Sequence, residues 1–232
     1  MSEDVYIAST SNVKCLKKQR KRIEKLFNRA IRERNEEDLV TLTKIYALLY
    51  SAYAETSFLK LIHTPGAFNE EEIEQIMNSH NLEEKWCKCV ECAFRQYKTI
   101  NNKGQIANKK KKLDKVLRKY IIKPSEIRNK VAHGQWEICL NTDCTKKNDA
   151  ATSEMQQLDF VKIDKYYVIY DMFQQCILDL IVSPRTHYRD FNHILSDLKQ
   201  YISRTENWTL DTKKQKILTS KKYVGYQNRN NQ

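Results

Sequence analysis

Apolar residues recur along most of this chain at intervals of three and four, the spacing of an amphipathic α-helix. These stripes predict helices over residues 13–34, 36–63, 70–79, 82–100, 105–122, 126–133, 159–182 and 188–203. Asn35 and Asn69 directly precede two of them and are followed by acidic residues, so each is predicted to be an N-cap. The stretch 45–54 is apolar on nearly all sides, which predicts that the second helix is the buried centre of the fold.

Helix-breaking residues separate several of these segments. The triplet Thr-Pro-Gly at 64–66 predicts the end of the second helix, and Gly134 predicts the end of the helix over 126–133. Pro124 and Ser125 predict that the chain breaks and restarts there, with Ser125 at the N-cap or in the first turn.

One long segment has no helical period. Residues 137–157 are rich in Asn, Thr, Asp and Lys, so we expect a loop, with a short β-hairpin that pairs 137–140 with a strand near Met155. The tail over 209–232 is polar and basic and is expected to be mobile.

The composition agrees with a helical chain. Only 4 Gly and 3 Pro occur in 232 residues, and sandwiches, barrels and Gly-rich nucleotide loops need many more turn residues than this. With 41% hydrophobic residues the chain can still bury a core. We therefore expect an all-α helical bundle in three parts: a basic N-terminal helix over 1–34 packed on the bundle, a helical domain over 35–204, and a basic tail over 205–232.

Charge favours an anionic partner. The formal net charge is +12, and it is arranged in blocks: residues 14–34 hold ten Lys or Arg and two Glu, and residues 103–123 hold nine Lys or Arg and one Asp. Nucleic acid is the first candidate for such blocks, although a basic helix can also be a solvated face. No secretory signal or apolar span is visible and the number of Cys is odd, so we expect a cytoplasmic protein with no membrane contact.

A cluster of cysteines at Cys87, Cys89 and Cys92 raises the alternative of a zinc site. The cluster lies in a predicted amphipathic helix, and the C-x2-C spacing of zinc knuckles occurs only once in the chain. Small buried thiols are the preferred interpretation, because free Cys behaves as a small hydrophobe. No metal and no cofactor are predicted.

The stretch most informative about chemistry is 127–136, Ile-Arg-Asn-Lys-Val-Ala-His-Gly-Gln-Trp. It places Arg128 and His133 five positions apart, with Asn129 directly after the arginine. This string resembles the signature of the HEPN superfamily of helical toxins, abortive-infection proteins and CRISPR-associated ribonucleases, in which a polar residue follows Arg and His comes four to six positions after it. The resemblance implies a metal-independent ribonuclease that acts as a dimer.

The residue types suit that chemistry. His133 can give or take a proton near neutral pH, and Arg128 offers a planar, permanently charged fork for two phosphate oxygens. Asn129 could orient the phosphate or fix the imidazole tautomer. Glu55, the one acid in the stretch 45–59, is a candidate partner for Arg128 or His133. The alternatives are that His133 only caps its helix and that Arg128 only forms an ion pair.

Cleavage needs an acid and a base, whereas one motif supplies a single His. A two-fold homodimer whose interface includes 126–136 would bring two motifs together. Five lysines are the predicted RNA contacts: Lys109, Lys110, Lys111, Lys112 and Lys130. The leading hypothesis is an RNA endonuclease of the toxin or phage-defence type, which an antitoxin or another defence protein could control. The alternatives are an inert HEPN-like dimer that binds RNA or protein, and a zinc-stabilised adaptor.

Overall fold

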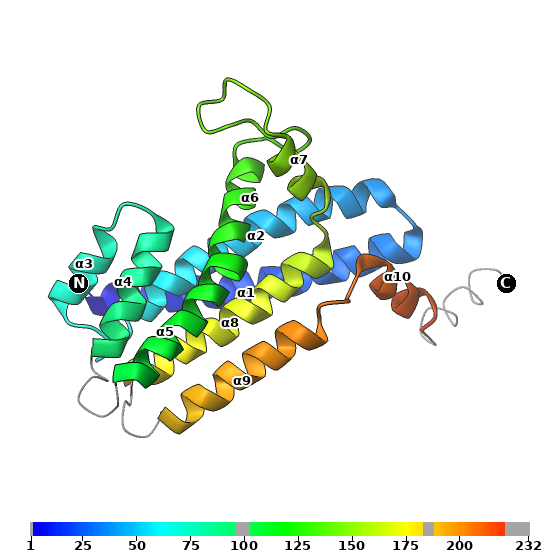
Figure 1. Cartoon of the computed structure of the whole chain (residues 1–232). Helices are drawn as coiled ribbons and strands as arrows, with labels where there is room; N and C mark the ends of the chain where they lie inside the picture. Colours follow the sequence, from blue (N-terminus) through cyan, green and yellow to red (C-terminus); the bar gives the residue numbers. More distant parts are fainter. Residues whose placement is uncertain (1, 96–102, 183–187, 221–232) are drawn as a thin grey trace.

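The computed structural model describes residues 2–95, 103–182 and 188–220 of the chain (Figure 1). These residues form an all-α helical bundle, as the sequence predicts, with no β-strand and with one isolated β-bridge between Leu140 and Lys147. In chain order the elements are α1 (Ser2–Glu33), α2 (Glu36–Ile62), α3 (Glu70–Met77), α4 (Leu82–Arg95), α5 (Lys103–Leu117), the π-helix η1 (Arg118–Ile122), α6 (Lys123–Ala132), α7 (Asp149–Gln156), α8 (Phe160–Val182), α9 (Tyr188–Arg204) and α10 (Leu210–Leu218).

The centre of the bundle is built on α2, which packs against α1, α6 and α8. Aromatic rings fill the space between them: Phe160 stacks on Phe27 at a centroid distance of 4.0 Å and on Tyr46 at 4.2 Å. The ring contacts continue along α2 and α8 through Tyr50, Tyr53, Tyr167, Tyr170, Phe173 and Trp86. The prediction that α2 is the central helix is confirmed.

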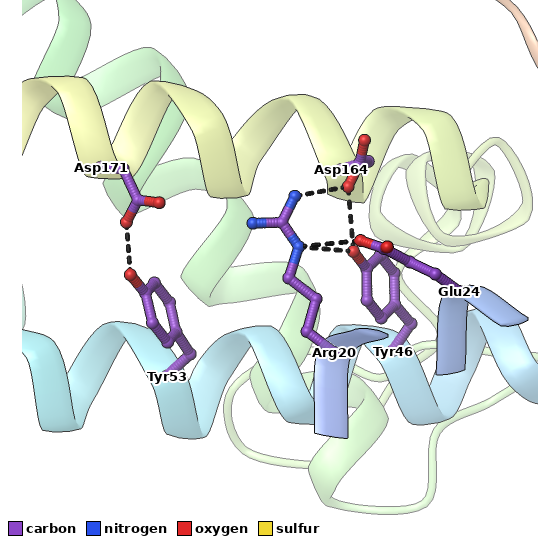
Figure 2. A network of polar contacts seen from close by, with 6 residues as sticks. All are labelled: Arg20, Glu24, Tyr46, Tyr53, Asp164 and Asp171. Atoms are coloured by element: carbon purple, nitrogen blue, oxygen red, sulfur yellow. Dashed lines mark hydrogen bonds and ion pairs between the residues drawn. The ribbon is translucent and has the colours of Figure 1, made fainter. Parts of the chain in front are cut away.

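A polar network crosses this aromatic layer and joins three helices (Figure 2). Arg20 of α1 donates from Nη2 to Oδ1 of Asp164 on α8 at 2.7 Å, and from Nε to the hydroxyl of Tyr46 on α2 at 3.1 Å. Tyr46 in turn donates to Asp164 at 3.0 Å, and Glu24 accepts from Arg20 Nε at 3.2 Å. The guanidinium also lies over the ring of Tyr167, 4.3 Å from its centroid.

Farther along the same pair of helices, Tyr53 donates a short hydrogen bond to Asp171 (Figure 2). Burial raises the pKa of Tyr53 and of Tyr46 well above the usual value, and Asp171 and Asp164 raise them further. Both hydroxyls therefore stay protonated and act as donors across the physiological pH range.

The segment from α5 to α6 is one continuous rod rather than two helices with a break (Figure 1). A new helix, α6, does begin at the predicted place, with Pro124 in its first turn, where its missing N–H leaves no hydrogen bond unmade, but no break in the chain precedes it. Ser125 lies in the first turn of α6, one of its two predicted places, and donates to the carbonyl of Ile122 at 2.6 Å instead of acting as the N-cap. The join is a π-helix, in which Lys123 N–H donates to the carbonyl of Arg118 five residues earlier.

The predicted β-hairpin near Met155 is also wrong. Met155 lies in α7, which Asn148 begins by accepting a hydrogen bond from Ala151 N–H at 3.0 Å. Leu140 bridges Lys147 instead, and the rest of 137–148 is irregular. The N-cap at Asn148 thus favours a helix over the strand that the weak pattern predicted. An N-cap satisfies the backbone N–H groups at the start of a helix locally, whereas a strand needs a distant partner.

The two ends of the chain are more helical than predicted. Helix α1 begins at Ser2, eleven positions before the predicted start. The prediction missed these turns because they carry exposed residues such as Ile7 and show no clear apolar stripe. The predicted tail contains α10, which Thr209 caps and which Lys214 ties to Glu36 at 2.7 Å. The last part of the predicted 82–100 helix and the end of the tail lie outside the described residues. Within them, no helix is long and apolar enough to cross a membrane.

The network in Figure 2 yields a stability prediction. Asp164→Asn keeps the shape of the side chain but removes the charge that Arg20 and Tyr46 contact. Hydrogen bonds to charged groups contribute about 1.5–3 kcal/mol, so we expect the free energy of unfolding to fall by that amount in urea denaturation. The matched change at the exposed Asp197 of α9 should have almost no effect. Equal losses in the two variants would contradict the role assigned to the network.

Candidate functional site

The end of α6 fixes the backbone of the motif at 127–136. Gly134 has φ +74°, a left-handed conformation that suits glycine, and it ends the helix as predicted. Its N–H donates to the carbonyl of Val131 at 3.1 Å, and Gln135 N–H donates to that of Lys130 at 2.9 Å. This pair of bonds is a Schellman motif, and it makes His133 the C-cap residue.

Arg128 points from α6 toward α2, where its Nη2 forms a short ion pair with Glu55. The side chain of Arg128 is only 18% exposed, and its Nε is buried with no hydrogen-bond partner among the described residues. Glu55 is 54% exposed, so it lies at the edge of the bundle rather than inside it. The expectation that Glu55 pairs with a residue of the motif is confirmed, and the residue is Arg128.

His133 and Asn129 are both solvent exposed. The backbone carbonyl of Asn129 accepts from His133 N–H at 3.0 Å, and in the described part of the chain no hydrogen bond joins either side chain to Arg128 or Glu55. Five positions along an α-helix correspond to a rotation of about 140°, which accounts for this separation. Within one chain, therefore, Arg128 is anchored while the imidazole at the helix end is open to solvent.

The five predicted RNA contacts differ in accessibility. Lys109 is buried, with Nζ 5.4 Å from the ring centroid of Phe191, and Lys110 is half-buried over the ring of Phe94. Lys130 donates to the carbonyl of Leu140 at 2.6 Å and so holds the loop after α6. Of the five, only Lys111 and Lys112 are exposed.

The apolar residues in and next to the predicted interface segment 126–136 divide into two groups. Ile127 and Val131 are buried in the core of their own chain and are not available to a partner. Trp136 is 39% exposed and Ile138 is 46% exposed, and both lie in the loop that follows α6. Trp136 donates from its indole N–H to the carbonyl of Val131 at 2.9 Å, which fixes the ring at the end of α6.

The cysteine cluster lies on α4. Cys89 and Cys92 are buried in the core, as preferred from the sequence, and Cys87 is half-buried. Burial raises the pKa of all three thiols, which favours the protonated form over the thiolate that zinc needs. Among the described residues, no three His, Cys, Asp or Glu side chains are gathered as a metal site would require.

A cavity of about 420 Å³ beside α6 was not predicted from the sequence. Its lining includes Lys119 and Lys123 from the rod and Lys162 and Lys165 from α8. These pairs are spaced four and three positions apart, so each lies on one face of its helix. That spacing was the available signal, but only the fold shows that the two pairs share a cavity.

Comparison with known proteins gives no match: no protein-family model fits the chain, and no curated protein or solved structure is significantly similar to it. The resemblance to HEPN ribonucleases therefore rests on the string 127–136 and on the helical architecture.

The exposure of Glu55 leads to a second prediction. Removing its charge in Glu55→Gln should lower the free energy of unfolding by less than about 1 kcal/mol, because half-exposed ion pairs contribute little. The control is Glu91→Gln, whose carboxylate is 48% exposed and pairs with both Lys88 and Arg95. A loss for Glu55→Gln well above that of the control in chemical denaturation would show that the Arg128 pair is chiefly structural.

Proposed function

We propose that this protein is a metal-independent RNA endonuclease whose site combines Arg128 and His133 at the interface of a homodimer. The observation that carries the proposal is the arrangement of the motif. Arg128 is anchored by a carboxylate from a different helix, and His133 stands exposed at a helix end set by Gly134. Phosphodiester cleavage requires a fixed cation and an exposed proton carrier, and the motif supplies one of each.

The reaction follows from these groups. A base takes the proton of a ribose 2′-hydroxyl, and the 2′-oxygen bonds to phosphorus as the bond to the 5′-oxygen breaks. An acid then protonates the leaving 5′-oxygen, giving a 2′,3′-cyclic phosphate and a 5′-hydroxyl. Imidazole suits either proton transfer, and Arg128 stabilises the charge that grows on the phosphorane oxygens. Glu55 acts through Arg128 as a positioning residue.

A dimer supplies the second proton-transfer group. His133 of one subunit can serve as base and the same residue of the other as acid, if a two-fold axis brings the two ends of α6 together. Trp136 and Ile138 are exposed in the loop after α6 and would be covered by such a contact. The proposal places the interface there rather than on Ile127 and Val131.

The charge of the chain fits a polyanionic substrate. At +12 overall, with Lys111 and Lys112 exposed on α5, the protein would release counterions when it binds RNA. We propose a cytoplasmic toxin or phage-defence role, in which an antitoxin or another defence protein would restrain the activity. The seven unpaired cysteines agree with a reducing compartment.

One observation favours a second candidate, an inert HEPN-like dimer that binds RNA or a protein. The guanidinium of Arg128 is already engaged by Glu55, and its Nε faces no hydrogen-bond partner among the described residues. In a purely structural role, the ion pair with Glu55 would hold α6 on α2, and the guanidinium of Arg128 would not be available to bind phosphate. The two candidates differ in one measurement, RNA cleavage by the purified protein.

The catalytic proposal predicts that Arg128→Ala and His133→Ala each reduce the rate of RNA cleavage by about 10²–10⁴, with circular dichroism unchanged. His193→Ala, an exposed histidine on α9, is the control and should cleave like the wild type. Cleavage should persist in EDTA and leave cyclic phosphate ends. An RNA with a 2′-deoxy substitution at the scissile nucleotide should not be cleaved. Inhibition by EDTA, or cleavage of the deoxy substrate, would refute the mechanism.

The dimer proposal predicts two protomers per particle in light scattering at micromolar concentration. Ile138→Glu buries a charge in the proposed interface, so it should shift the protein toward monomers and lower cleavage in parallel. The control is Ile7→Glu, which changes another exposed isoleucine, 58% exposed against 46% for Ile138, near the start of α1. A wild-type monomer that cleaves RNA at full rate would rule out the composite site.

A further inference from the structure

A second cavity, of about 250 Å³, lies among α1, α2 and α8, and Tyr53 and Asp171, which pair in Figure 2, both line it. Neither Arg128 nor His133 lines this cavity, so it is separate from the candidate ribonuclease site. Most of its lining is charged or polar, with three aliphatic residues beside these: Lys17, Tyr53, Ser57, Lys60, Thr64, Asp171, Gln174, Gln175, Val13, Leu61 and Leu178. Buried polar groups are costly without a partner, so this lining favours a polar ligand.

Ser57 is the residue of this lining that most clearly lacks a partner. It is only 1% exposed, and its Oγ is buried with no hydrogen-bond partner of normal geometry among the described residues. Its carbonyl, by contrast, accepts a short hydrogen bond from Nε2 of Gln174. Burial and Asp171 raise the pKa of Tyr53 and the hydroxyl of Ser57 opposes the rise, so this hydroxyl lies beside the Tyr53–Asp171 pair. A hydroxyl held at this place is available to a ligand.

Charges of both signs reach the cavity from different helices. Lys17 of α1 and Lys60 of α2 line it, as does Asp171 of α8. The ammonium of Lys17 lies 5.8 Å from the ring centroid of Tyr53, and that of Lys60 lies 5.9 Å from that of Tyr6. In the described part of the chain, no ion pair joins either lysine to a carboxylate, and Asp171 has one oxygen left after the hydrogen bond from Tyr53. Two cations and one carboxylate are thus available to a ligand.

A zwitterion is the ligand that gives each of these charges a partner. A simple anion would place a like charge next to Asp171, and a simple cation would do the same next to the two lysines. A neutral sugar would remove water from the charged groups without giving any of them a counter-charge. The volume is slightly below that of drug-sized ligand sites, about 300–1,000 Å³, so a small molecule is expected. An α-amino acid is a small zwitterion, and an aliphatic side chain suits the apolar part of the lining.

We propose that this cavity binds a free aliphatic α-amino acid. The ammonium of the ligand contacts Asp171 and the hydroxyl of Ser57, and its carboxylate lies between Lys17 and Lys60. Because these four residues come from α1, α2 and α8, the bound ligand links the three longest helices and stabilises the bundle. This inference does not rest on the proposed function.

The test is isothermal titration calorimetry of the full chain with L-leucine, L-valine and two leucine analogues that each lack one charge. The analogue 4-methylpentanoate lacks the ammonium, and 3-methylbutylamine lacks the carboxylate. Each charged group makes charge-assisted contacts, so L-leucine should bind at least about tenfold more tightly than either analogue. Equal affinities for L-leucine and either analogue, or no binding of L-leucine and L-valine, would overturn the inference.

The double variant Lys17→Gln, Lys60→Gln tests the carboxylate contact. It should bind L-leucine at least about tenfold more weakly without weakening the binding of 3-methylbutylamine, which has no carboxylate. The matched control Lys14→Gln, Lys18→Gln loses the same charge at exposed positions of α1 outside the cavity, so L-leucine affinity should change less than about twofold. An unaffected cavity variant, or equal losses in the two variants, would contradict the assignment.

Ser57→Ala gives a readout that separates binding from folding. The hydroxyl of Ser57 forms no hydrogen bond in the free protein, so its removal should leave the melting temperature unchanged or raise it. The affinity for L-leucine should nevertheless fall by about threefold or more, whereas that for 4-methylpentanoate, which has no ammonium, should not. A lower melting temperature with unchanged L-leucine affinity would refute the place of Ser57 in the site.

The two proposals can fail separately. Arg128→Ala and His133→Ala should each keep the wild-type affinity for L-leucine, since neither residue lines this cavity. If the wild type cleaves no RNA but binds L-leucine through Lys17 and Lys60, the proposed function fails and the amino-acid site stands. If it cleaves RNA and binds none of the probes, the reverse holds.

Discussion

The contact of Arg20 with Asp164 and Tyr46 governs how the three longest helices meet. A guanidinium inside an aromatic layer must find acceptors, and here it finds them on α2 and α8 at once. Burial by itself lowers the pKa of Arg20, but Tyr46 and Asp164 raise it above its usual value, so the charge is retained. Aromatic rings can pack in many registers, whereas the guanidinium of Arg20 meets its acceptors in only a few. The network therefore sets the register of α1, α2 and α8.

The candidate ribonuclease residues other than Glu55 lie on helices that pack against one side of the framework formed by α1, α2 and α8. The rod from α5 to α6 crosses α2 and α8, and its α6 end carries Arg128 to Glu55 (Figure 1). The cavity of about 420 Å³ lies where the same rod passes α8 and α9. One element therefore carries the motif and part of the wall of that cavity, and the rigid helices behind it limit how far either can move.

The sequence predicted those features that depend on near neighbours. Asn35 and Asn69 cap their helices as expected, because a cap involves only the next three residues. Glu55 was recognised as needing a partner, since a lone acid in an apolar stretch is conspicuous, but its exposure depends on how α6 crosses α2 and could not be inferred. Lys109 could have been excluded as an RNA contact, because Ile106, Leu113 and Val116 place it on the buried stripe of α5. The π-helix has no comparable signal, and the sequence alone gave no reason to join α5 to α6.

That π-helix has a consequence for how the motif faces the rest of the molecule. Its hydrogen bond from Lys123 to Arg118 spans five residues instead of four, so the rod holds one residue more than an α-helix would. Each residue turns a helix by about 100°, and a chain one residue shorter between 118 and 122 would rotate all of α6 by that angle. Arg128 would then swing away from Glu55, and Ile127 would leave the wall of the cavity beside α6. The length of this segment therefore sets the rotation of α6 about its own axis. Homologues with the same motif residues but a different number of residues here would present a different face of α6 to α2.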